Sequence, residues 1–335
     1  AIKAQLDEWK NKPSVQAVVV VGAGEKAFCA GGDVVEMHRT SAAYGEILTD
    51  TSTQDFFTRE YRLDHHIHTY NKPIVVWGHG IVMGGGMGLM SGASHRVVTE
   101  RSRLAMPEVT IGLFPDVGGT FFLNHAPGKT GLFLGLTGAS FNAADAKFVG
   151  MADRFIEHTN KADVLDALCE ADWQNTAKTE GRVVSSVLRR FEQQSLAAQP
   201  EGQVQAHLDW INDVCDANST AELVAGIVSY SGEDEWLQRA IKGLVNGCPV
   251  TPYLVAEQMR RGKHMSLADI FRMELTMAVN CTRRGHFKEG VRALLIDKDR
   301  EPKWVPATVA EVPSEEVEAF FIAPWADNAH PLRDL

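Results

Sequence analysis

Runs of apolar, mostly β-branched residues occur three times in the first third of the chain, and the first two end at glycine. Residues 15–21 read Val-Gln-Ala-Val-Val-Val-Val and are followed by Gly22-Ala-Gly24. Residues 72–77 and 95–100 contain two shorter runs of the same kind. Continuous rather than alternating apolar runs are typical of strands buried on both faces of a parallel sheet. The pattern therefore predicts such a sheet, with crossover connections between its strands.

Helical spacing appears between the first two runs and again after about residue 160. Phe56, Glu60, Leu63, Ile67 and Tyr70 recur at the period of a helix, which predicts a crossover helix. Four later amphipathic stretches cover residues 162–172, 182–196, 203–217 and 235–245. We therefore expect an α/β fold with a core over 1–158, a mainly helical region over 159–304 and a tail over 305–335.

The stretch from Ile74 to Ser94 contains no Asp, Glu, Lys or Arg. It is long enough to cross a bilayer, but it contains seven glycines. Glycine at that density favours a strand, a loop and a helix over a membrane span. We expect no membrane association.

Composition places the chain among ordinary globular proteins, with 335 residues, 44% hydrophobic and 23% charged. Its net charge of −10 argues against a nucleic-acid partner. The five cysteines are odd in number and contain no C-x-x-C pair, so neither a disulfide framework nor a zinc site is indicated. This favours a reducing compartment: the cytoplasm, or the mitochondrial matrix in a eukaryote. Ala1 opens directly into an amphipathic segment, with no leader visible.

Two small-residue loops are candidates for binding an oxygen through main-chain N–H groups. They read Phe28-Cys-Ala-Gly-Gly-Asp33 and Met83-Gly-Gly-Gly-Met-Gly88. Two such loops can form an oxyanion hole, although each loop alone is more readily interpreted as a tight turn. The match of Gly22-x-Gly24 to a dinucleotide fingerprint is rejected, because more glycines precede any helix. Gly128-Lys-Thr130 is also rejected as a phosphate loop, because the earlier glycine that this motif requires is absent.

Two carboxylates, Glu108 and Asp116, lie in an otherwise apolar stretch rich in glycine and proline. Burial raises the pKa of a carboxyl group, which suits a general acid or base. For a single acid, a helix cap or an ion pair with arginine is an equally natural reading. The pair together with the glycine loops predicts a catalytic site.

The order of these segments resembles the crotonase (enoyl-CoA hydratase/isomerase) superfamily. The resemblance rests on Lys26 to Asp33, His79 to Gly86 and Met106 to Gly119. Two segments are similar to the 3-hydroxyisobutyryl-CoA hydrolase branch: Phe114-Pro-Asp-Val-Gly-Gly119 and 287–299. The resemblance covers most of the chain and implies a core of repeated ββα units. It also implies a first strand that would lie upstream of Ala1.

The resemblance implies roles for particular residues. Main-chain N–H groups of Gly32 and Gly85 would hold the thioester oxygen of an acyl-CoA. Hydratases of the superfamily carry a second glutamate where this chain has Gly88, which argues against ordinary hydration. The hydrolase branch pairs a glutamate and an aspartate at the positions of Glu108 and Asp116. Glu108 would attack the thioester or activate water, and Asp116 would orient water or handle protons.

Further expectations concern the substrate and what the site lacks. Glu60 matches a position that contacts the acyl part, or else it is a solvated helix residue, and Lys298 is a candidate contact of coenzyme A phosphates. We expect no cofactor other than the coenzyme A of the substrate, and no metal. The histidines at 65, 66 and 68 are too closely spaced on one helix for a shared metal site. Cys29 lies beside the first loop but is read as a small packing residue. A homo-oligomer is possible.

The expected function is therefore hydrolysis of a short branched 3-hydroxyacyl-CoA thioester, most plausibly 3-hydroxyisobutyryl-CoA in valine catabolism. An enoyl-CoA hydratase or isomerase is the alternative within the same superfamily. A non-catalytic acyl-CoA-binding protein is the second alternative, and a nucleotide-dependent enzyme is the third.

Overall fold

The computed structural model describes all residues except 44–50, 174–176 and 327. The predicted α/β class is confirmed. Two compact units interleave along the chain. Unit 1 comprises Ala1–Gly31, Leu63–Leu104 and Phe141–Ala206, and unit 2 comprises Gly32–Arg62, Ala105–Ser140 and His207–Leu335.

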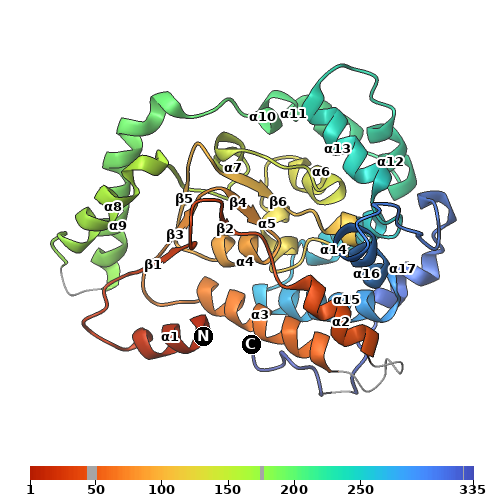
Figure 1. Ribbon diagram of the computed structural model, residues 1–335, viewed down its shortest axis with the longest axis horizontal. Coiled ribbons are helices and arrows are strands. Elements are labelled where there is room, and N and C mark those ends of the chain that lie inside the picture. The colour runs from red at the N-terminus through yellow and green to blue at the C-terminus, as the bar shows by residue number, and fades with distance from the viewer. Residues whose placement is uncertain (44–50, 174–176, 327) are drawn as a thin grey trace. The chain divides into compact units, whose positions relative to one another are not determined.

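The strands alternate between two sheets, as repeated ββα units require (Figure 1). The four-stranded sheet has the order β1 (Val18–Val21), β3 (Ile74–Gly78), β5 (His95–Val98) and β7 (Arg154–Phe155). The three-stranded sheet has the order β2 (Ala27–Cys29), β4 (Ile81–Met83) and β6 (Arg103–Ala105). Neighbours in the larger sheet pair in parallel, and so do β2 and β4. The predicted parallel pairing is confirmed.

Burial of the first predicted strand is less complete than its sequence suggests. All five residues of the inner strand β3 are buried, whereas Val21 in β1 is 43% exposed. Among the described residues β1 pairs with β3 alone.

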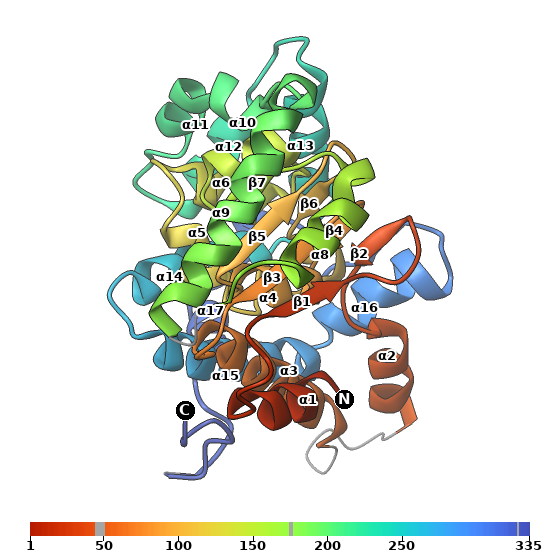
Figure 2. The same cartoon turned by 90° about the vertical axis from the view of Figure 1, so that its left-hand side faces the viewer.

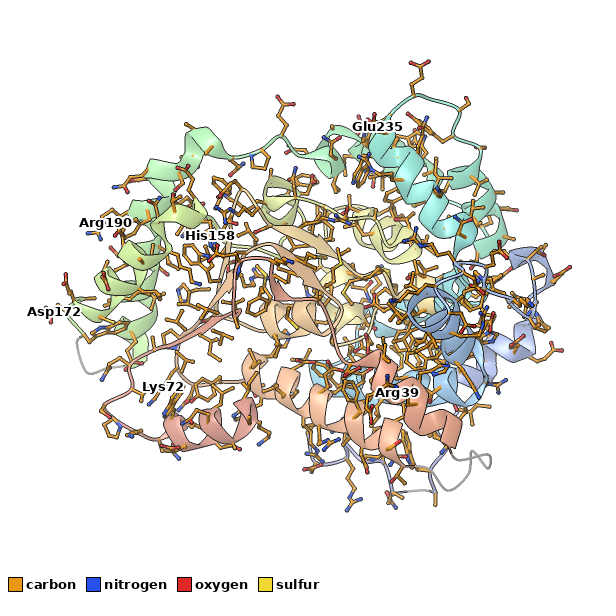
Figure 3. The ribbon with its side chains drawn as sticks, in the orientation of Figure 1. Arg39, Lys72, His158, Asp172, Arg190 and Glu235 are labelled. Carbon is orange, nitrogen blue, oxygen red and sulfur yellow. The ribbon has the colours of Figure 1, made fainter. Side chains whose placement is uncertain are left out.

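Helices cover both faces of the larger sheet. Val75 and Trp77 of β3 share a buried cluster with residues of α8 (Lys161–Cys169) and α9 (Ala177–Ser195), which Figure 2 shows in front of the sheet. The Trp77 indole also donates to His158, a residue labelled in Figure 3. On the opposite face lies α4 (Gly85–Ser91), so close to β3 that a Cβ on Gly78 would lie 2.8 Å from the Met90 sulfur.

The uncharged stretch of residues 74–94 is divided between β3, β4 and α4, as predicted. No helix among the described residues is both long enough and apolar enough to cross a membrane. Before the sheet, α1 (Ile2–Lys10) buries Leu6. Lys72, labelled in Figure 3, fixes this helix by donating to the carbonyls of Trp9 and Lys12.

The remaining helices follow the predicted change to helical structure, because after β7 the described residues form no further strand. The predicted helix over 203–217 is two helices, interrupted at His207, and the helix over 235–245 is confirmed as α13. In unit 1 the other helical elements are α7 (Ala143–Phe148), η2 (His158–Asn160), η3 (Leu196–Ala198) and α10 (Gln203–Ala206).

Unit 2 carries the remaining helical elements. Those at or before residue 140 are α2 (Val34–Ala43), α3 (Ser52–His68, which continues into unit 1), η1 (Glu108–Ile111), α5 (Gly119–Asn124) and α6 (Thr130–Thr137). Those after it are α11 (Leu208–Val214), α12 (Thr220–Val228), α13 (Glu235–Asn246), α14 (Thr251–Gly262), α15 (Leu267–Arg283), α16 (His286–Val291), η4 (Arg292–Ile296), η5 (Val309–Glu311) and α17 (Ser314–Phe320).

Candidate active site

Glu108 begins the short 3₁₀ helix η1, directly after Pro107. The helix ends at Gly112, whose left-handed backbone (φ 67°) lets its N–H return to the Glu108 carbonyl. The Glu108 side chain is 5% exposed, and its Oε2 atom has no hydrogen-bond partner among the described residues. A buried carboxylate oxygen without a partner is costly unless something else uses it, which makes Glu108 a candidate for chemistry.

The support for η1 comes from α16. A Cβ added to Gly112 would lie 2.5 Å from backbone atoms of His286, and one added to Gly290 would lie 2.5 Å from backbone atoms of Ile111. The segment 287–299, which resembles a family motif, therefore begins in a helix packed directly against the helix that carries Glu108. Two glycines allow this close approach.

Asp116 lies in the turn between η1 and α5, where its carbonyl accepts the N–H of Gly119 at 2.7 Å. The side chain is 4% exposed, and its Oδ2 accepts a hydrogen bond from the Tyr61 hydroxyl at 2.7 Å. Tyr61 lies on α3 and is fully buried. The two acids predicted from the sequence are therefore both buried in unit 2.

Glu60 precedes Tyr61 on α3 and is half-buried. Burial, and then the Asp116 charge, raise the pKa of Glu60 to about 8. The interaction with Asp116 places Glu60 near the predicted pair of Glu108 and Asp116. This position agrees with the predicted role of Glu60 as a contact of the acyl part of the substrate. The alternative reading of Glu60 as a solvated helix residue does not fit its burial.

The acids of this cluster disfavour one another's ionisation. Burial, and then Asp116, raise the pKa of Glu108 well above its ordinary value. Burial also raises the pKa of Asp116, to about 6, although the Tyr61 hydrogen bond opposes the shift. No Lys, Arg or His forms an ion pair with either acid in the part of the chain that is described. As pH rises, Asp116 therefore ionises before Glu108.

A fourth acid, Glu274 on α15, was missed by the sequence analysis, and so was Tyr61. Glu274 is fully buried, and its two oxygens accept the N–H groups of Gly118 and Thr120 at 2.7 and 2.9 Å. Burial raises its pKa to about 8. A signal existed: Glu274 shares a helical face with the apolar residues Ile270, Phe271 and Ala278.

The proposed oxyanion glycines fall in different units, Gly85 in unit 1 and Gly32 in unit 2. Gly85 opens α4, and the first N–H groups of a helix have no acceptor within it. Its loop packs against the first glycine loop, since a Cβ on Gly31 would lie 4.0 Å from the Gly85 nitrogen. In unit 2, Gly32 lies against the Phe56 ring, which a Cβ would approach to 2.6 Å. Their joint role stays a prediction.

Lys298 is exposed and has a left-handed backbone (φ 58°). Its neighbours Asp297 and Asp299 both bind Arg292, each at 2.7 Å. Nothing else in the structure bears on its predicted contact with coenzyme A, which stays a prediction. Among the residues that the structure describes, no group of His, Cys, Asp or Glu side chains is arranged to hold a metal ion.

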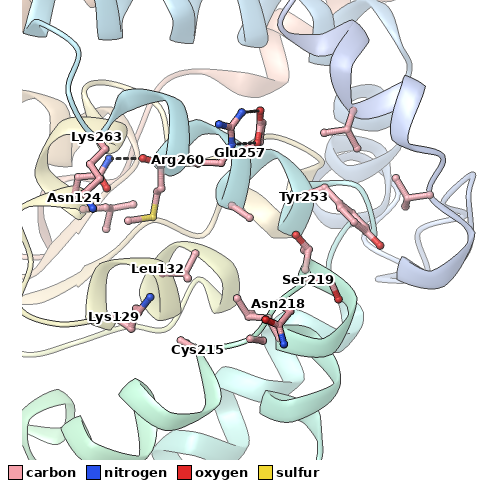
Figure 4. A pocket seen from close by; sticks show the side chains of 18 of the residues that line it. Asn124, Lys129, Leu132, Cys215, Asn218, Ser219, Tyr253, Glu257, Arg260 and Lys263 are labelled. Atoms are coloured by element: carbon pink, nitrogen blue, oxygen red, sulfur yellow. Dashed lines mark hydrogen bonds and ion pairs between the residues drawn. The ribbon is translucent and has the colours of Figure 1, made fainter.

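A separate groove of about 840 Å³ lies in unit 2, between the end of α5 and helices α12, α14 and α17 (Figure 4). Its basic side chains are largely neutralised: Arg260 binds Glu257, and Lys129 lies 3.6 Å from Asp216. None of the residues predicted for the site lines this groove. It therefore does not compete with the acidic cluster as the candidate active site.

The contribution of Glu60 to protein stability should fall as pH rises from about 4.5 to about 8. The pKa of Glu60 is higher in the folded protein than in the unfolded chain, so between these two pKa values folding is coupled to the uptake of a proton. The stability that this proton provides is lost as pH rises through the pKa of the folded protein. Urea unfolding at pH 5 and pH 8 measures the loss. Glu60→Gln should reduce it, whereas Glu315→Gln, which changes an exposed glutamate, should not. Equal losses in wild type and Glu60→Gln would contradict the assigned burial of charge.

Residues 1–321 match the family model described as enoyl-CoA hydratase/isomerase. The "3-hydroxyisobutyryl-CoA hydrolase, mitochondrial" of Gallus gallus is 37% identical over 321 residues, covering 96% of this chain and 80% of that protein. The protein of the same name from Danio rerio is 38% identical, with 96% and 81% covered.

Two solved structures are similar over nearly the whole chain. A carnitinyl-CoA dehydratase from Mycobacterium thermoresistibile has a TM-score of 0.85 and 34% identity, covering 100% of this chain and 90% of its own. An enoyl-CoA hydratase from Rhodobacter sphaeroides 2.4.1 has a TM-score of 0.82 and 34% identity, covering 96% and 88%. These similarities agree with the resemblance inferred from the sequence.

Proposed function

This chain belongs to the enoyl-CoA hydratase/isomerase family, and we propose that within it the protein hydrolyses the thioester of a short branched 3-hydroxyacyl-CoA, most plausibly 3-hydroxyisobutyryl-CoA. The curated relatives named above as hydrolases of that substrate support the choice. The observation that carries the proposal is the buried pair Glu108 and Asp116, with Oε2 of Glu108 unpartnered among the described residues.

Thioester hydrolysis needs a group that attacks or activates water and a proton for the departing thiolate. Between its first and second ionisation, the coupled pair Glu108 and Asp116 holds one proton and one charge. Because Asp116 ionises first, this proton starts on Glu108, and the reaction can use both groups once the proton has passed to Asp116. The main-chain N–H groups of Gly32 and Gly85 would stabilise the oxyanion.

Two routes satisfy this arrangement. In the nucleophilic route the Glu108 carboxylate attacks the thioester carbon, the C–S bond breaks, the thiolate takes the Asp116 proton, and water hydrolyses the resulting anhydride. In the general-base route Glu108 takes a proton from the attacking water, and Asp116 again protonates the thiolate. Repeated turnover in oxygen-labelled water distinguishes them, because only an anhydride on Glu108 carries label into that side chain.

The hydratase alternative is supported by the names of the two solved structures. Against it stands Gly88, a buried position in α4 with no side chain, where hydratases of the superfamily carry their second glutamate. With a single glutamate at Glu108, addition of water across a double bond lacks one of its two acids. We therefore favour hydrolysis.

A panel of acyl-CoA thioesters tests the proposal directly. Free thiol should be released fastest from 3-hydroxyisobutyryl-CoA, more slowly from isobutyryl-CoA, and the enoyl absorbance of crotonyl-CoA should change more slowly than either. Hydration of crotonyl-CoA at a rate above every hydrolysis rate would favour the hydratase. Binding of coenzyme A in calorimetry without turnover of any thioester would favour a non-catalytic binding protein.

The remaining expectations follow from this activity. We propose that the protein needs no cofactor besides the coenzyme A of its substrate, and that valine catabolism is its context. All five cysteines are free thiols, which suits a reducing compartment. The mitochondrial names of the relatives favour the matrix over the cytoplasm, if the protein is eukaryotic.

A further inference from the structure

The turn that carries Asp116 is held from behind by buried polar side chains of α14 and α15. Three side chains bind its backbone on both sides of Asp116: Thr251 donates to the Leu113 carbonyl at 2.8 Å, Gln258 to the Pro115 carbonyl at 3.1 Å, and Glu274 accepts from Gly118 and Thr120. All three are fully buried. Because the backbone is fixed, the direction of the Asp116 carboxylate depends on its own side-chain torsions and on its partner.

The side-chain partner of the carboxylate is Tyr61, and the backbone N–H of Asp116 itself is a second donor. Among the described residues no other side chain hydrogen-bonds Asp116, and the 2.7 Å bond is made to Oδ2. The Tyr61 ring is itself held, with its centroid 5.7 Å from that of Phe57 and 5.8 Å from that of Phe271. Figures 1 and 2 both show α3, which carries Tyr61, beside α15, which carries Phe271. A rigid donor on one oxygen leaves Oδ1 without a side-chain partner.

Among the described residues, no Lys, Arg or His forms an ion pair with Asp116. The titratable groups that interact with it come from three elements: Glu60 and Tyr61 on α3, Glu108 on η1, and Glu274 and Cys281 on α15. Each is an acid or a weak acid. A donated hydrogen bond is therefore the side-chain interaction that favours the charged form of Asp116. The phenol remains a donor, because burial and the Asp116 charge raise the pKa of Tyr61 well above its ordinary value.

Resting on the proposed hydrolysis, we propose that Tyr61 is a positioning residue for Asp116. Its hydroxyl occupies Oδ2, turns Oδ1 toward the reaction as the oxygen that exchanges the proton, and makes Asp116 rather than Glu108 the carboxylate of the free site. Tyr61 gives up no proton and touches no reacting atom in this role.

Tyr61→Phe removes the hydroxyl and keeps the ring. The pH profile of thiol release in this variant therefore shows the effect of losing the hydrogen bond from Tyr61 to Asp116. The acidic limb of kcat/KM should lie near pH 6 in the wild type, where the pair loses its first proton. Without the donor this limb should move up by about one to two pH units, the effect of a hydrogen bond to a charged group.

Tyr253→Phe is the matched control. Its hydroxyl also donates within unit 2, to the Val309 carbonyl at 3.0 Å, but it lies on α14 and lines the separate groove. It should leave the pH profile unchanged. A purely structural role for Tyr61 would lower activity equally at all pH values, and an unshifted acidic limb in Tyr61→Phe overturns the proposal.

Carbon NMR of protein labelled at the aspartate side chains follows Asp116 without any assay of activity, with Asp116→Asn to assign its resonance. In the wild type this resonance should titrate near pH 6, and in Tyr61→Phe at higher pH. If no acyl-CoA is hydrolysed, the proposed function fails, while the titration still tests Tyr61. If Tyr61→Phe does not fold, a wild-type Asp116 that stays protonated above pH 8 overturns the inference, and one that ionises near pH 6 supports it.

Discussion

Replacing Glu108 by Gln should reduce thiol release from 3-hydroxyisobutyryl-CoA by at least about 10²-fold and as much as 10⁴-fold. Gln has nearly the volume of Glu but can neither attack the thioester nor take a proton from water. The loss should appear in kcat rather than in KM, because the side chain that holds the substrate in place is nearly unchanged in shape. Spectrophotometric titration of released thiol across substrate concentrations measures both constants.

The stability of Glu108→Gln separates this chemical effect from damage to the fold. Burial raises the pKa of Glu108, and its Oε2 atom lacks a hydrogen-bond partner among the described residues, so the carboxyl group does little for the folded state. The variant should unfold at the same urea concentration as the wild type or at a higher one. A folded variant that retains full thiol release would remove Glu108 from the reaction. A variant that loses activity only through unfolding would leave its role unsupported.

Gly112→Ala should destabilise the folded protein. The alanine Cβ would lie 2.5 Å from backbone atoms of His286, and backbone cannot move aside as a flexible side chain can. A positive φ of 67° adds strain for any residue with a Cβ. Overpacking and strain together should cost about 2–5 kcal/mol of unfolding free energy. Because Gly112 ends η1, the shift should also displace Glu108 and lower thiol release.

Gly285→Ala is the matched control for the clash. Gly285 also has a positive φ, 88°, and stands one residue before His286, but a Cβ there would meet no atom within 4 Å. Gly285→Ala should therefore lower the unfolding free energy only by the cost of a positive φ in a residue with a Cβ, about 1–2 kcal/mol. Urea unfolding of both variants gives the comparison. Equal losses for the two would mean that α16 does not constrain η1 through this contact.

Local sequence patterns were enough to predict the carboxylate pair. Glu108 and Asp116 stand out because acids are rare in apolar, glycine-rich segments, and both are buried in the structure. The glycine loops, the parallel strands and the helical second half were likewise predicted from periodicity and composition. These features are local, because each depends on a few consecutive residues. The period of the apolar positions, or the residue types themselves, is therefore enough to predict them.

Only the tertiary structure decided how the acids are held and how they ionise. Tyr61 reaches Asp116 across 55 residues, and Glu274 reaches Gly118 across 156 residues. Neither contact follows from a local pattern, because a helical period shows which residues share a face but not what that face meets. Burial sets the pKa values of the cluster, and burial is a property of the packed chain. The sequence therefore determined which residues could do the chemistry, and the packing of α3, α14 and α15 around one turn decided which of them carries the charge.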